Sequence, residues 1–357
     1  MKLGIVGLPN AGKSTLFNAL TSSKAQAAKY MFSTVDANTG SVPVPDSRLD
    51  VLAGMYSPKK VTPAVCEFMD IAGLVRGASK GEGLGNRFLG SIRESDAICH
   101  VLRCFDDDNV PHPEGGVDPR RDAEIISLEL ALSDLDLAER RAERARKLMK
   151  GDRAMAAELA LWERLEEHLT GGAPARSMPV SQQERDILST CPLLSMKPVL
   201  YVANTDEDDN KYYETVKALA AEDGAEVLSV CAKLEEELAG LGDFERAEFL
   251  SALGLGESGL GKLIRASYRL LGYISFLTAG APEVRAWTIT EGMKAPQAAG
   301  RIHSDIERGF IRAEVVAFGD LEACGSTAAA KEKGLLRVEG REYVVKDGDV
   351  IHFRFNV

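Results

Sequence analysis

The stretch Gly7-Leu8-Pro9-Asn10-Ala11-Gly12-Lys13-Ser14-Thr15 decides the fold, because it matches the pattern G-x-x-x-x-G-K-[ST] in full. An apolar run at 3–6 precedes it and a helical pattern at 16–20 follows it, which is the strand–loop–helix setting that this pattern requires. Glycines let the main-chain N–H groups of such a loop point inward at phosphate oxygens. The alternative is an ordinary glycine-containing turn.

The chemistry of this loop assigns a role to each of its polar groups. Lys13 is expected to carry its charge to the β- and γ-phosphates of a nucleotide, and the Ser14 hydroxyl is expected to bind Mg²⁺. The predicted phosphate-binding residues are Asn10, Ala11, Gly12, Lys13, Ser14 and Thr15.

Short apolar runs alternate with helical patterns in the first hundred residues. Residues 3–6, 65–69 and 97–102 have the composition of buried strands, and residues 198–203 form a further one downstream. Strands alternating with helices predict an α/β domain, with a mostly parallel sheet and helices on both faces.

A long helical segment interrupts this alternation. Asp118 and Pro119 have the residue types of an N-cap and a first helical position, and the helix is expected to run to about Lys150. Gly151-Asp152 breaks it, and a second helix follows at 153–169, so we predict an inserted antiparallel helical hairpin, a short coiled coil. The tip of this hairpin is basic, with Arg140, Arg141, Arg144, Arg146, Lys147, Lys150 and Arg153. These cations either complement the helix macrodipole in solvent or contact RNA phosphates.

The last part of the chain has a different pattern. A helix at 260–271 is followed, from about residue 274, by a strand-like run at 283–289 and a helical run at 298–309. Further strand-like runs lie at 342–345 and 350–355. A module of about 80 residues with mixed β structure fits the size range of an independent domain.

A second motif, Asp70-Ile71-Ala72-Gly73, ends the strand at 65–69. An acidic residue at this place serves Mg²⁺, and the N–H of Gly73 can sense the γ-phosphate. Thr34 is expected to complete the coordination of Mg²⁺, although it could be only a surface-loop residue. Lys13, Gly73 and Asn10 are the catalytic candidates, and Ser14, Thr34 and Asp70 are the metal ligands.

Leu74 occupies the position at which many GTPases have a glutamine that orients the attacking water. A leucine cannot hydrogen-bond to water, so slow intrinsic hydrolysis is expected. Asn10 is a candidate helper, because its side-chain oxygen could hold a K⁺ ion together with the phosphates.

The third motif follows the strand at 198–203. Guanine is commonly recognised by N-K-x-D, but this chain has Asn204-Thr205-Asp206-Glu207. The longer side chain of Glu207 need not reach the edge of guanine. The hydrogen-bond donors of guanine would then stay unpaired, at a cost of about 1–3 kcal/mol each. ATP is therefore expected to bind better than GTP, with Cys231 and Ala232 packing beside the base. The alternative is an acidic turn in which Asp206 replaces the usual aspartate.

Composition limits the other possibilities. A net charge of −11 over 357 residues argues against wholesale coating of nucleic acid but leaves a local contact open. No apolar run reaches about 18 residues, so no membrane span is expected, and the strand-like segment at residues 1–7 means that no signal peptide is expected either. The six cysteines form no C-x-x-C pair and are expected to be buried free thiols in a reducing cytoplasm.

Taken together, the three motifs and the tail at 300–315 resemble the Obg-like ATPases of the YchF family, over essentially the whole chain. The resemblance implies a P-loop G domain at 1–118 and 190–273, an inserted helical hairpin at 119–189, and a β-grasp TGS domain at 274–357. It also implies ATP hydrolysis with Mg²⁺, association with the ribosome or the RNA of its large subunit, and a cytoplasmic location. Asn204 and Thr205 would lie at the adenine. Met31 and Cys231 depart from the family's usual proline and serine.

Two other functions stay open at this point. One is a true GTPase of the Obg type, which competition between ATP and GTP would separate from an ATPase. The other is a nucleotide-gated binding module whose turnover is incidental.

Overall fold

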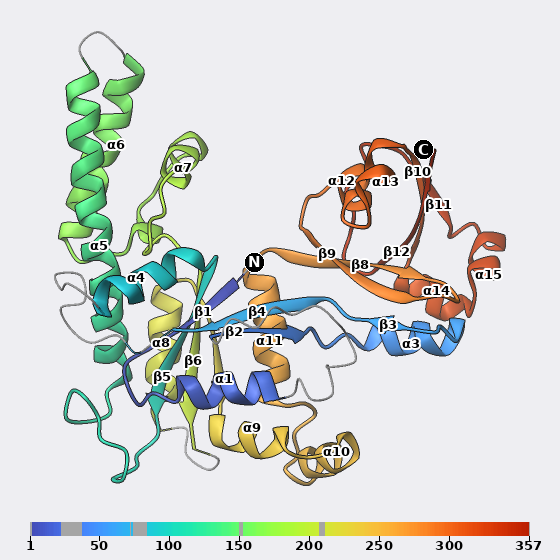
Figure 1. The fold of residues 1–357 in the computed structure, drawn as a ribbon, viewed down its shortest axis with the longest axis horizontal. Coiled ribbons are helices and arrows are strands. Elements are labelled where there is room, and N and C mark those ends of the chain that lie inside the picture. Colours follow the sequence, from blue (N-terminus) through green and yellow to red (C-terminus); the bar gives the residue numbers. More distant parts are fainter. Residues whose placement is uncertain are drawn as a thin grey trace. The chain divides into compact units, whose positions relative to one another are not determined.

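The structure is a computed structural model that describes residues 2–22, 38–71, 73, 84–149, 153–206 and 211–356 (Figure 1). Several sequence predictions fall outside these residues: those for Thr34, Leu74 and Glu207, and the hairpin break at Gly151-Asp152. The described residues form two compact units. The first holds 2–22, 38–40 and the described residues between 67 and 263, and the second holds 41–66 and 264–356.

The first sheet has the strand order β2-β4-β1-β5-β6-β7. Its strands are β2 (Thr39–Pro43), β4 (Val65–Asp70), β1 (Lys2–Val6), β5 (Ala97–Cys104), β6 (Val199–Thr205) and β7 (Glu226–Val230). Every pairing from β4 to β7 is parallel, which confirms the predicted α/β fold. β5 and β6 are buried along their whole length, as expected for parallel strands covered on both faces.

One face of this sheet is covered by α4 (Leu84–Glu94), the start of α5 (Pro119–Leu148) and α8 (Tyr213–Glu222). Their apolar side chains join those of β1, β5 and β6 in a single buried cluster that includes Phe88, Ile126, Val216, Ile98 and Tyr201. Elsewhere in the unit, α1 (Lys13–Ser22) packs against α9 (Ala232–Ala239). α10 (Asp243–Ala252) and the start of α11 (Gly259–Leu270) complete it. The loop at the carboxyl end of β1 leads directly into α1.

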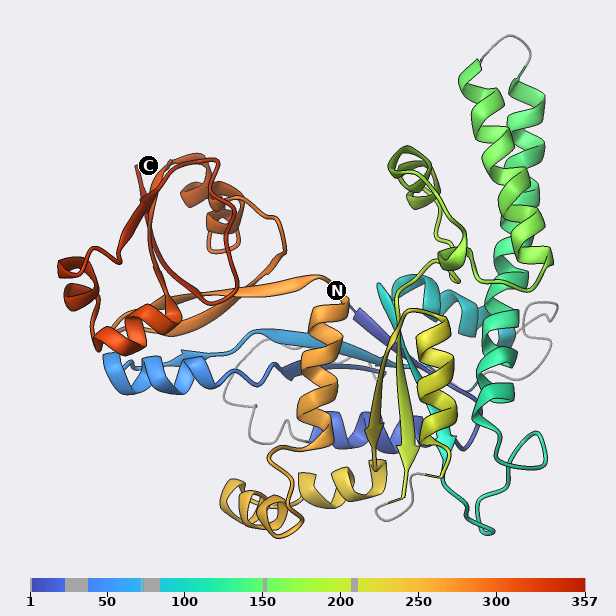
Figure 2. The same cartoon turned by 180° about the vertical axis from the view of Figure 1, so that it is seen from behind.

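The predicted hairpin is formed by α5 and α6 (Arg153–Thr170), which lie side by side in both views (Figures 1 and 2). Asp118 caps α5 by accepting from the N–H of Arg121, as its sequence position indicated. On α6 a stripe of large side chains packs on a stripe of alanines from α5, namely Leu159, Trp162, Leu165 and Leu169 on Ala131, Ala138, Ala142 and Ala145. Small residues on one helix let the other approach closely, so the hairpin has a core of its own.

The chain returns to the sheet through η1 (Ala175–Ser177) and α7 (Gln182–Ser189). The buried carboxylate of Asp134 on α5 fixes this return, because it accepts from the N–H groups of Leu194 (2.8 Å) and Ser195 (2.7 Å). A third bond comes from the Ser195 hydroxyl (2.6 Å).

The second unit contains a mixed sheet with the order β11-β10-β12-β8-β9-β3. Its strands are β11 (Arg337–Glu339), β10 (Phe310–Ala317), β12 (Asp349–Phe355), β8 (Tyr273–Ala279), β9 (Val284–Thr290) and β3 (Val61–Thr62). Apolar residues of α12 (Ala295–Gly300) and α13 (Ser304–Arg308) cover one face. Three further helices belong to it: α3 (Ser47–Tyr56), α14 (Phe318–Cys324) and α15 (Thr327–Glu332). Because β3 pairs with β9, a segment from the first half of the chain completes this sheet.

Two predictions in this unit are wrong. The helical run at 298–309 is two helices, because His303 adopts an extended conformation (φ −162°) and its ring nitrogen accepts from the N–H of Asp305. The run at 342–345 is not a strand and makes only an isolated bridge between Lys294 and Val344. The carboxylate of Asp349 instead accepts from the hydroxyl of Tyr343 and the N–H of Lys346, which holds this stretch in a turn.

All six cysteines are free thiols, as predicted, but only four are buried, while Cys231 and Cys324 are half-buried. None of the helices in the described part of the chain combines the length and apolarity that a bilayer crossing requires.

Candidate nucleotide-binding site

The loop from Gly7 to Gly12 connects β1 to α1, so the motif has the strand–loop–helix setting that its sequence predicted. Gly12 has a φ of +91°, a region that side chains rarely adopt, and a Cβ atom there would lie 2.1 Å from Nδ2 of Asn204. Asn10 also has a positive φ, +66°, which asparagine tolerates better than most residues. The loop conformation therefore depends on these residue types.

Lys13 lies inside this loop and is only 6% exposed. Its ammonium group donates to the main-chain carbonyl of Leu8 at 2.8 Å. Burial lowers the pKa of Lys13 to about 8, while the carboxylate of Asp70 acts in the opposite direction. The protein alone thus stabilises the positive charge of Lys13 poorly, and the negative charge of a bound anion would stabilise it.

Asp70 and Gly73 meet the loop at the same place. The Ser14 hydroxyl donates to Oδ2 of Asp70 at 3.0 Å. The other oxygen, Oδ1, is buried and has no hydrogen-bond partner among the described residues. A Cβ atom at Gly73 would lie 3.2 Å from Nζ of Lys13 and 3.1 Å from the nitrogen of Pro9, so this glycine is in direct contact with the loop.

A hydroxyl beside a carboxylate with an unused buried oxygen is a donor set that suits Mg²⁺, which prefers hard oxygen ligands. Mg²⁺ typically takes one or two protein ligands and completes its shell with phosphate oxygens and water. The residues present therefore fit the ion that the sequence suggested, and Ser14 and Asp70 would be its protein ligands.

Asn204, at the end of β6, links the phosphate loop to the loop after β7. Its Nδ2 donates to the carbonyl of Ala11 (3.0 Å), and its Oδ1 accepts from the N–H of Ala232 (3.0 Å). Both ends of this buried amide are thus used within the protein. In this position Asn204 holds together the two loops that would flank a nucleotide, in addition to any contact with the base.

The remaining base-side residues lie around this link. The hydroxyls of Thr205 and Ser229 are 3.0 Å apart in a hydrogen bond between β6 and β7. Cys231 precedes α9 as its N-cap residue, with no side-chain cap bond, and Ala232 begins that helix. Thr15 lies on α1, directly after Ser14.

A further segment, the loop after β5, lies at this site and was not predicted from the sequence. The carbonyl of Pro111 accepts from Nδ2 of Asn10 at 2.9 Å, so this loop touches the phosphate loop. The available signal was Arg103, a charged residue in a mainly apolar run at 97–104, which proves to be 3% exposed.

Comparisons with known protein families agree with this arrangement. A family described as "50S ribosome-binding GTPase" matches residues 2–135. A second family, YchF-GTPase_C, described as "Protein of unknown function (DUF933)", matches residues 273–356.

Comparisons with individual proteins extend over the whole chain. The "Ribosome-binding ATPase YchF" of Bacillus subtilis is 54% identical over 99% of both chains. The protein of the same name from Escherichia coli O157:H7 is 51% identical over 100% of this chain and 99% of its own. A solved structure, "Structure of the Schizosaccharomyces pombe YchF GTPase", matches with a TM-score of 0.90 and 39% identity, covering 99% of this chain and 97% of that one.

The fold and the loop around Lys13 define a P-loop protein of the GTPase superfamily. Within that superfamily, the full-length identity shows that the chain belongs to the YchF family.

Proposed function

We propose that this protein is an ATPase that binds and slowly hydrolyses ATP with Mg²⁺ and acts as a nucleotide switch on the ribosome. The observation that carries the proposal is the meeting of Lys13, Ser14, Asp70 and Gly73 at the start of α1. The names of the bacterial relatives, ribosome-binding ATPases, support the same activity.

Each group of site residues has its own proposed role in binding and hydrolysis. Main-chain N–H groups of Asn10 to Thr15 and the Lys13 ammonium bind and orient the triphosphate. Ser14 and Asp70 would hold Mg²⁺, as would Thr34, and the bound ion would supply positive charge beside the phosphate oxygens. Gly73 offers its N–H to the γ-phosphate, so that hydrolysis releases one contact of the switch.

The preference for ATP over GTP rests on the altered base motif. Thr205, at the position of lysine in N-K-x-D, is bonded to Ser229 and only 5% exposed, while Asn204 is occupied by Ala11 and Ala232. Glu207 would face the base with a longer arm than aspartate. The Schizosaccharomyces pombe relative is called a GTPase, so the direct test is competition of ATP and GTP for the purified protein. Tighter binding of GTP would replace this proposal with a GTPase of the Obg type.

A K⁺ ion is the proposed helper in place of a water-orienting glutamine. The Asn10 amide donates through its nitrogen to Pro111, which leaves its oxygen for a cation. Turnover measured in K⁺ should exceed turnover in Na⁺ at equal ionic strength. Equal rates in the two salts would remove K⁺ from the mechanism.

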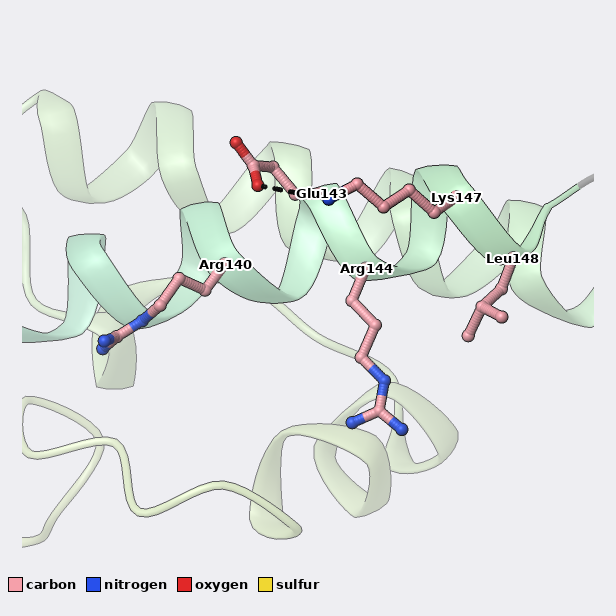
Figure 3. Close-up of a pocket in the computed structure, with 5 residues that line it drawn as sticks. All are labelled: Arg140, Glu143, Arg144, Lys147 and Leu148. Atoms are coloured by element: carbon pink, nitrogen blue, oxygen red, sulfur yellow. Dashed lines mark ion pairs between the residues drawn. The ribbon is translucent and has the colours of Figure 1, made fainter.

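The hairpin tip is the proposed contact with ribosomal RNA. Arg140, Arg144 and Lys147 line a hollow of about 370 Å³ together with Glu143 and Leu148 (Figure 3). Arg140 and Arg144 extend from one side of α5, whereas Lys147 lies 4.0 Å from Glu143 along the helix. Neither Arg140 nor Arg144 has an ion-pair partner within the described residues. Arginines spaced by one helical turn can each meet a phosphate group of RNA.

Ribosome cosedimentation tests this contact. Arg140→Glu with Arg144→Glu should weaken binding strongly and flatten its dependence on salt, because two phosphate contacts are lost. The matched control is Arg185→Glu with Lys217→Glu, which changes net charge equally at exposed positions on α7 and α8. Equal losses in both pairs would indicate an effect of net charge and not of the tip.

The finer assignments belong to the same proposal. We divide the chain into a G domain at 1–118 and 190–273, the hairpin at 119–189, and a TGS domain at 274–357, and we place it in the Obg-like branch. A cytoplasmic location follows from the proposed partner, because ribosomes work there.

A further inference from the structure

The loop after β5 is held by one buried side chain. Arg103 is 3% exposed, and each of its three nitrogens donates to a different main-chain carbonyl: Nε to Phe105 (3.1 Å), Nη1 to Val110 (2.8 Å) and Nη2 to Asp107 (3.1 Å). Its guanidinium also lies 4.6 Å from the centre of the Phe105 ring. Only the planar fork of arginine can reach three carbonyls arranged in this way.

The held loop contacts two other parts of the chain, and one of them is the phosphate loop. Pro111 directly follows Val110, whose carbonyl accepts from Arg103. The carbonyl of Pro111 accepts from the side chain of Asn10 in the phosphate loop. Asp106, within the span that Arg103 holds, accepts from Lys211 and Tyr212, which follow the base motif in the chain. The first contact is the more consequential, because an exposed ion pair such as that of Asp106 contributes little.

The contact at Asn10 bears on the conformation of the phosphate loop. Asn10 has a φ of +66°, which costs free energy unless neighbouring groups stabilise it. The hydrogen bond from its side chain to Pro111 is a stabilising contact that only a fixed Pro111 carbonyl can provide.

We propose that Arg103 is a positioning residue for hydrolysis: it fixes the loop at 105–111 and thereby sets the side chain of Asn10 in the phosphate loop. This inference rests on the proposed function, since it assigns Asn10 a place beside the reacting phosphates. Arg103 itself does not touch the nucleotide in this account. Its loss should therefore lower kcat more than it weakens ATP binding.

A double-mutant cycle tests this role. Arg103→Lys and Asn10→Ala should each lower kcat about tenfold and change KM by a smaller factor, and the double variant should be no worse than the poorer single variant, because both remove the same contact. The matched control is Arg176→Lys, which alters another largely buried arginine that pairs with Asp223 and donates to the carbonyl of Ser195. In the double variant of Arg176→Lys and Asn10→Ala, the two fold-reductions in turnover should multiply.

Asp107→Ala provides a second route if Arg103→Lys folds poorly. Asp107 is at the surface, and its carboxylate orders the same loop by accepting from the N–H of Asn109 (2.9 Å). This variant should lower kcat in the same direction by a smaller factor. The proposal is overturned if folded Arg103→Lys and Asp107→Ala turn over ATP within twofold of the parent, or if the effects of Arg103→Lys and Asn10→Ala multiply. A parent protein that binds no ATP would instead remove the proposed function.

Discussion

The buried ammonium of Lys13 predicts that ATP affinity falls as pH rises above 8. With a pKa of about 8 in the free protein, Lys13 is mostly charged at pH 7 but mostly neutral at pH 9. Bound phosphates favour the charged form, so binding at pH 9 must take up a proton. The affinity should fall by a factor of about ten at pH 9 and about one hundred at pH 10, or about 1.4 kcal/mol for each tenfold step.

Titration calorimetry measures this directly. Binding of MgATP at pH 7, 8, 9 and 10, in buffers of different ionisation enthalpy, gives both the affinity and the number of protons taken up. We expect almost no uptake at pH 7 and nearly one proton at pH 9. Lys13→Arg is the control, because its guanidinium stays charged over the whole range and its affinity, even if weaker, should not follow the same curve. An affinity that stays flat to pH 10 in the parent protein would show that the charge of Lys13 does not bind the phosphates.

The other predictions concern single positions. The lowered pKa of Lys13 means that its charged form is disfavoured in the folded protein. Lys13→Met should therefore raise the free energy of unfolding of the free protein by up to about 3 kcal/mol at pH 7, measured with denaturant. This gain should vanish as pH rises from about 8 to 10.5, because Lys13 then becomes neutral in both the folded and the unfolded states. Gly12→Ala should cost about 2 kcal/mol or more and abolish nucleotide binding, because its Cβ would meet Asn204 at a φ of +91°; an unchanged unfolding midpoint would contradict this. Asp70→Asn should raise the Mg²⁺ concentration needed for half-maximal turnover by tenfold or more, measured by Mg²⁺ titration at fixed ATP. Trp162→Ala should cost about 3–5 kcal/mol in the hairpin and reduce helical circular dichroism, yet leave ATP binding intact.

Features with a local physical cause were predictable from the sequence. The phosphate loop follows from glycine conformation between a strand and a helix, and the hairpin follows from the Asp118 cap and the apolar stripe on α6. In each case, residues close together in the chain determine the structure, so no long-range contact had to be known.

Features that depend on distant partners were not predictable. The two residues of β3 are too few to carry a strand pattern in the sequence. They form a strand only because they pair with β9, some 220 positions further along the chain (Val61 with Val284). The break at His303 depends on its ring nitrogen, which accepts from the main-chain N–H of Asp305 two residues further along. The roles of Asn204 and Arg103 depend on carbonyls that folding brings to them, and the sequence shows only the polar side chain.

Calorimetric titration of the parent protein and of Lys13→Ala with MgATP and MgGTP shows whether the loop around Lys13 holds the nucleotide. We expect ATP to bind the parent more tightly than GTP does, and the variant to bind neither while remaining folded. Equal ATP affinity in both proteins would contradict this expectation, because the phosphates would then be held somewhere other than at the start of α1.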